Sequence, residues 1–143
     1  MTQTLRDALA AARVAATAPQ PGNSRDLVLG ILRAAAEDPE VQAALRDVPA
    51  GRALLRFIDT HEAIEFSAGE GHLAASAAAE RGPGPKVDAT SATWLGLIAG
   101  TLKPWLAFTR GMVVCRAGIS ELRWMQQVAE RLQKAYAEEP ALE

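Results

Sequence analysis

The sequence predicts an α+β protein in which a five-stranded, mixed and mostly antiparallel sheet is covered by helices on one side. Apolar residues recur every three or four positions before residue 50 and alternate with polar ones from residue 52 to 77. Helical and strand patterns then follow each other from residue 87 to 136. With 143 residues, we expect a single domain over 1–143, helical over 1–50 and sheet-containing over 51–137.

Three helices are expected before residue 50. The first begins near Thr4 and ends before a loop at 18–24 that is rich in proline and glycine. Asn23 or Ser24 caps the second helix. Pro39 starts a third, because proline fits the first turn of a helix and interrupts one elsewhere.

Strands are expected next, over 52–58, 64–67 and 73–77. Short turns join these three, so neighbouring strands should be antiparallel. A longer loop leads to a fourth short strand at 87–89, and a fifth is expected over 112–116. A helical crossover separates the fourth and fifth strands, which leaves a parallel pairing between them open.

The segment between the last two strands combines glycine stops with large apolar residues. Ser91 is expected to cap a helix that Gly100 ends. Pro104 suits the first turn of a second helix, which Gly111 closes. The four residues after Gly111 have the pattern of a buried strand. Ser120 is expected to cap the final helix, which runs to residue 136.

Composition excludes several classes of function. A net charge of −2 gives no electrostatic reason to expect nucleic acid as a partner. The single cysteine, Cys115, excludes an internal disulfide and, with no apolar run long enough to cross a bilayer, favours a cytoplasmic protein. His61 and His72 lack the spacing of metal ligands, and no serine elbow is present. The residues therefore indicate no catalytic set, metal or cofactor.

The run from Gly100 to Gly111 reads Gly-x-Leu-x-Pro-x-x-Ala-Phe-x-x-Gly. Together with the strand that contains Asp88 and the helix after it, this run resembles the sterol carrier protein family. The resemblance implies a five-stranded sheet backed by helices around an apolar tunnel that takes fatty acyl chains, sterols or similar lipids. The chain departs from the family pattern after the last strand, where it has Ala117-Gly118.

Large apolar residues of the last hundred positions are the candidates for lining such a tunnel. Each has an alternative role as ordinary core, because aromatic and aliphatic side chains dominate core burial wherever they occur. The candidate ligand-binding residues are Phe66, Trp94, Leu95, Ile98, Leu102, Trp105, Phe108, Met112, Val114, Trp124, Met125 and Val128.

The low combined volume of one strand, with Leu73, Ala75 and Ala77 on one face, is what favours a hollow over a filled core. Opposite large rings, they leave space for a ligand. The alternative is that the helices simply lie closer to the sheet there.

The sequence thus favours non-enzymatic binding, and transfer, of a lipid or other apolar small molecule. Two alternatives stay open: a protein-interaction or homodimerisation module that uses the same apolar face, and an enzyme acting on acyl substrates. Six basic residues between 103 and 134 favour transient contact with an anionic membrane, or else form a solvated helix face. The alanine-rich composition is typical of a GC-rich bacterium, which favours fatty acyl or isoprenoid ligands.

Overall fold

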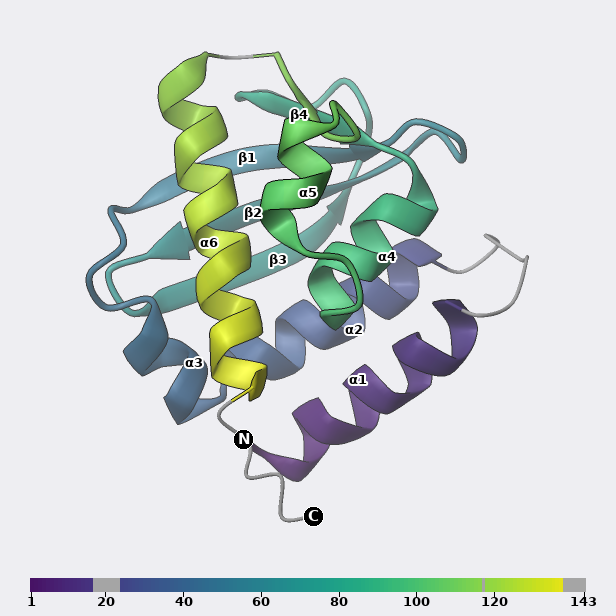
Figure 1. Cartoon of the computed structure of the whole chain (residues 1–143). Helices are drawn as coiled ribbons and strands as arrows, with labels where there is room; N and C mark the ends of the chain where they lie inside the picture. The colour runs from purple at the N-terminus through teal and green to yellow at the C-terminus, as the bar shows by residue number, and fades with distance from the viewer. Residues whose placement is uncertain (17–23, 117, 138–143) are drawn as a thin grey trace.

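A computed structural model describes residues 1–16, 24–116 and 118–137, and places a five-stranded sheet behind a layer of helices (Figure 1). Helices α2, α3, α4, α5 and α6 lie against one face of this sheet or its end, and α1 packs outside them on α2 and α4. The elements, in chain order, are α1 (Gln3–Ala16), α2 (Ser24–Ala36), α3 (Pro39–Ala44), β1 (Gly51–Phe57), β2 (Glu62–Gly69), β3 (His72–Ala78), β4 (Lys86–Ala89), α4 (Ser91–Ala99), α5 (Pro104–Thr109), β5 (Val114–Cys115) and α6 (Ile119–Ala137).

The strands lie in the order β3-β2-β1-β4-β5. The antiparallel pairs β1–β2 and β2–β3 are as predicted, and so is the mixed α+β class. The parallel alternative for β4 and β5 is wrong, because these two strands are antiparallel and β4 instead runs parallel to β1. The chain leaves β4 through α4 and α5 and returns in the opposite direction, which produces this arrangement.

The fifth strand is shorter and more exposed than predicted. Only Val114 and Cys115 form a ladder, opposite Asp88 and Val87. Because β5 is the edge of the sheet, Met112 and Val114 are 39% and 46% exposed, and only Val113 between them is buried. Cys115 is half-buried, so the prediction of a buried strand over the four residues after Gly111 is wrong for this residue too.

Two residues that were predicted to cap helices lie inside those helices instead. Thr90, and not Ser91, caps α4: its Oγ1 accepts a hydrogen bond from the Thr93 N–H at 3.3 Å. Ser91 lies inside the helix, and its N–H and hydroxyl donate to Asp59 Oδ1 at 2.8 and 2.9 Å. The last helix begins at Ile119, so Ser120 is likewise within it.

Other predicted helix ends are confirmed. Gly100 ends α4 in the left-handed conformation at φ 86°, which a residue without a side chain adopts at no steric cost. Pro104 opens α5, and Gly111 follows that helix at φ 70°. Asp38 caps α3, since its Oδ1 accepts from the Glu40 and Val41 N–H groups. Asn23, the alternative cap for α2, lies outside the described residues.

The N-terminal helices contribute directly to the hydrophobic core. Helix α2 covers β3, the strand with alanines on its inner face, and buries Val28, Ile31 and Leu32 completely. Helix α1 adds Leu5 and Leu9, and Arg13 Nε donates to the Ala99 carbonyl at the end of α4 at 3.1 Å. One cluster of buried apolar residues therefore extends from α1 to α6.

The opposite face of the sheet is partly covered by the loop between β3 and β4. This loop must cross β2 and β1, because β4 lies on the far side of β1 from β3. Leu54 points to that face, yet is 1% exposed, and a Cβ on Gly82 of the loop would lie 3.5 Å from its Cδ1. The loop thus protects an apolar side chain that the helices cannot reach.

Candidate functional site

The structure divides the twelve candidate ligand-binding residues into three groups by solvent exposure. Phe66, Trp94, Leu95, Ile98, Met125 and Val128 are buried. Leu102, Phe108 and Trp124 are partly buried and pack against the core. Trp105, Met112 and Val114 are exposed. The candidates therefore divide into a buried group, a group at the boundary of the core and an exposed group.

The interior group is centred on α4, whose residues 93–99 are all buried. Trp94 packs against Phe57 at a ring-centroid distance of 6.1 Å. Its Nε1 donates to the Arg56 carbonyl of β1 at 2.9 Å, so the one polar atom of the ring is paired. This bond fixes the indole against the sheet. Burial of this kind is what either a packed core or the wall of a closed lipid chamber requires.

Trp124 lies at the boundary between this interior and the surface. Its Nε1 donates to the Pro49 carbonyl at 3.0 Å, and its ring lies 6.0 Å from that of the fully buried Phe66. Outside the indole is a groove of about 440 Å³, between the start of α6, the start of β1 and the end of the loop before β4. We call it the Trp124 groove; it is lined by Pro49, Ala50, Gly51, Arg52, Pro85, Ser120, Glu121 and Trp124. The indole separates this groove from Phe66.

A glycine makes this arrangement possible. A Cβ on Gly51 would lie 2.5 Å from Trp124 Cε2, so the indole occupies the space of a side chain at position 51. In the sequence, Gly51 indicated only the end of the helical part. A glycine at the start of a strand is a known sign of close approach by another group, and that signal could have identified it.

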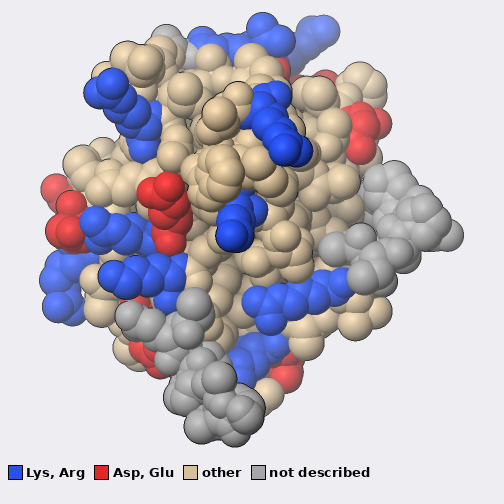
Figure 2. All heavy atoms as spheres, in the orientation of Figure 1, with Lys and Arg blue, Asp and Glu red and all other residues tan. Residues whose placement is uncertain are grey.

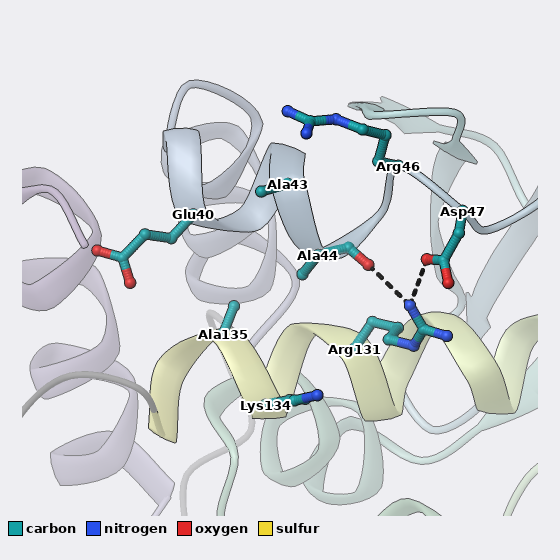
Figure 3. Close-up of a pocket in the computed structure, with 8 residues that line it drawn as sticks. All are labelled: Glu40, Ala43, Ala44, Arg46, Asp47, Arg131, Lys134 and Ala135. Atoms are coloured by element: carbon teal, nitrogen blue, oxygen red, sulfur yellow. Dashed lines mark hydrogen bonds and ion pairs between the residues drawn. The ribbon is translucent and has the colours of Figure 1, made fainter.

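A second groove, of about 500 Å³, lies between α3 and α6 and was not predicted (Figure 3). Alanines form much of its surface, with Arg46, Lys134 and Glu40 around them. The Arg131 guanidinium donates to the Asp47 carboxylate and, at 3.2 Å, to the Ala44 carbonyl. Arg131 holds the pKa of Asp47 below its usual range. These bonds attach α6 to the end of α3.

A polar network on the sheet face opposite the helices joins β4 to β1 and to the residue that follows β5. Asp88 of β4 is buried, and its two carboxylate oxygens accept from Arg56 Nε and Nη2 at 2.6 and 2.8 Å and from Arg116 Nε at 2.7 Å. Arg56, and then Arg116, lower the pKa of Asp88 against the opposing effect of burial. Bidentate pairing of this kind fixes β4 between β1 and the residue after β5.

The described residues do not bring metal-ligating side chains together. Within residues 1–16, 24–116 and 118–137, no three His, Cys, Asp or Glu side chains are placed as metal ligands would be. His61 is exposed and lies 3.4 Å from Glu80 Oε2. Among the described helices, none is long and apolar enough to cross a membrane.

Comparison with solved structures identifies the class of fold. A possible sterol carrier protein from Thermus thermophilus shares 22% identity over 78% of this chain and 84% of its own, with a TM-score of 0.56. Sterol carrier protein 2 shares 23% identity over 77% of this chain and 92% of its own, also with a TM-score of 0.56. A UbiJ-SCP2 ubiquinone synthesis protein shares 10% identity over 79% and 91%, with a TM-score of 0.54.

No family model matches the sequence, and the comparison with curated proteins gives no significant match. At these identities the structural matches show the fold. The chain has the sterol carrier protein 2 fold, as the run from Gly100 to Gly111 predicted.

Proposed function

We propose that this protein binds an apolar lipid non-covalently between the sheet and helices α4 to α6, and carries it without chemical change. The groove outside Trp124 is the proposed mouth of the binding site. Its volume of about 440 Å³ lies in the usual range for small-molecule sites, about 300–1,000 Å³. The apolar part of the lipid would leave water, which contributes roughly 25 cal/mol for each square ångström of surface.

The observation that carries this proposal is the position of Trp124 between a surface groove and the buried apolar interior. One side of the indole borders the groove, and its ring lies 6.0 Å from that of Phe66. In the proposed path, rotation of this single side chain opens the groove toward Phe66. The buried candidates behind it, Trp94, Leu95, Ile98, Met125 and Val128, are the proposed walls.

The names of the structural relatives support a lipid as the ligand. Two of them refer to sterol carriers, and the third to ubiquinone synthesis. Sterols and ubiquinone are both largely apolar molecules. We propose a fatty acyl, isoprenoid or sterol-like ligand, a cytoplasmic location as the single cysteine suggests, and loading and unloading by transient contact with a membrane.

Native mass spectrometry of the purified protein tests this proposal. A lipid-sized mass that stays with the folded protein and dissociates on denaturation is the expected result. Incubation with a fluorescent fatty acid and with isoprenoid competitors would then give the order of affinities.

Two other results would replace the proposal. A lipid-free dimer would favour an interaction module, and conversion of an added acyl ester would favour an enzyme. The interaction module has some structural support, because the side chains of Trp105, Met112 and Val114 are exposed.

A further inference from the structure

Exposed apolar side chains gather on the segment from α5 to the start of α6. Trp105 is 55% exposed and Ile119 65%, and Met112 and Val114 lie between them in the chain. In the described part of the chain, the other exposed large apolar residues are Val14 and Ile58. Exposed tryptophan is costly in water and is enriched where proteins meet the interface of a bilayer.

The same segment has an excess of positive charge. Lys103, Arg110 and Arg123 are exposed, against one acidic residue, Glu121, between positions 89 and 129. Arg116 does not belong to this group, because it pairs with Asp88 on the sheet face opposite the helices. Figure 2 shows Lys and Arg side chains around a largely uncharged area over α5 and the beginning of α6. The whole chain has a net charge of −2, so the charge is distributed unevenly.

We propose that this face docks on the surface of an anionic lipid bilayer, with Trp105 and Ile119 at the level of the headgroups. The docking face consists of Lys103, Trp105, Arg110, Met112, Ile119 and Arg123. Separate apolar side chains surrounded by cations match a surface that is negatively charged outside and apolar beneath. Charge complementarity therefore favours an anionic bilayer over a second copy of this acidic chain.

The docking face adjoins the proposed mouth of the lipid site, and in this respect the inference rests on the proposed function. Ile119 and Arg123 flank Ser120 and Glu121, which line the Trp124 groove. Docking through this face would bring the groove to the bilayer, so that a lipid could pass between them without crossing bulk water.

Vesicle flotation tests the docking face. The unmodified protein is expected to bind vesicles of phosphatidylcholine with phosphatidylglycerol, and to bind pure phosphatidylcholine at least tenfold more weakly. Lys103→Glu with Arg110→Glu should lower binding to the anionic vesicles roughly tenfold or more. Trp105→Ala should weaken it severalfold. The matched control is Arg33→Glu with Arg81→Glu, two exposed arginines outside the face, which changes the net charge equally.

Several results would overturn the docking face: no binding to anionic vesicles, equal loss in the control variant, or a dimer that Trp105→Ala dissociates. Binding of a soluble fluorescent fatty acid by the same variants separates this inference from the proposed function. Weaker vesicle binding with unchanged fatty acid affinity is expected. If neither the unmodified protein nor any variant binds the fatty acid, and the unmodified protein still binds anionic vesicles, only the lipid site is refuted.

Discussion

The indole of Trp124 occupies the space that a side chain on Gly51 would need, 2.5 Å from the position of its Cβ. Gly51→Ala is therefore expected to displace the indole and to break its hydrogen bond to the Pro49 carbonyl. The variant should show altered tryptophan fluorescence and altered fatty acid affinity. Gly30→Ala is the control, since a Cβ there meets nothing within 4 Å and should stabilise α2 by about 0.5–1 kcal/mol.

Trp124→Ala is expected to weaken fatty acid binding more than it lowers thermal stability. The ring borders the groove and is partly exposed, so its removal should lower Tm by only a few degrees. Loss of its contact with the ligand should raise Kd about tenfold, which corresponds to about 1.4 kcal/mol. Fluorescent fatty acid titration and thermal unfolding measure the two quantities. Unchanged affinity would remove Trp124 from the site.

Tyr136→Phe is expected to stabilise the protein by about 1 kcal/mol. The Tyr136 hydroxyl is buried and has no hydrogen-bond partner among the described residues, and such a group costs roughly 1–3 kcal/mol. Urea unfolding at neutral pH measures the difference. A loss of stability in the variant would show that the hydroxyl has a partner in the folded protein.

Because of Tyr136, the stability of the protein should also depend on pH in the alkaline range. Burial raises the pKa of Tyr136 above its ordinary value of 10. The unfolded chain therefore loses this proton first, and stability should fall as the pH rises above about 10. Comparison with Tyr136→Phe isolates this part of the pH dependence, because the variant keeps all other titrating groups.

Asp88→Asn is expected to destabilise the fold by about 2–4 kcal/mol, because Arg56 and Arg116 would lose their shared carboxylate. The pKa of Asp88 is lower in the folded protein than in the unfolded chain. Its contribution is thus complete above about pH 4 and is lost as the pH falls through the folded pKa. Acid unfolding of the variant should be less steep. Arg116→Ala should cost less than Asp88→Asn, as that side chain is 59% exposed.

Thr90→Ala is expected to cost about 1 kcal/mol through loss of the α4 cap, and Thr90→Ser should restore most of it. Thermal unfolding of the two variants measures this difference. An equal loss in both would mean that the hydroxyl of residue 90 contributes nothing to the cap.

Most of the fold was predictable because its signals are local. Gly100, Pro104 and Asp38 mark helix ends through backbone geometry or capping that no distant residue alters. The alternation over β1 to β3 identified the antiparallel strands in the same way. The position of β4 beside β1 depends on the path of the loop between β3 and β4. No short sequence pattern determines that path.

The candidate site was less predictable, because apolar character does not distinguish interior from edge. Val114 and Trp94 have equally apolar surroundings in the sequence, yet Val114 lies exposed on an edge strand and Trp94 is a buried residue of α4. The small residues of β3 predicted a hollow, but α2 covers that strand. No pattern in the sequence indicated where the helices of the first fifty residues pack against the sheet. Their contribution to the hydrophobic core was therefore not predicted.

The bond from Arg13 to the Ala99 carbonyl joins the first helix to one that is synthesised 86 positions later. During translation, α1 leaves the ribosome early but cannot complete its contacts until α4 has followed. Until then α1 can pack only against α2, and the hairpins of β1 to β3, whose partners are close in sequence, have time to form first.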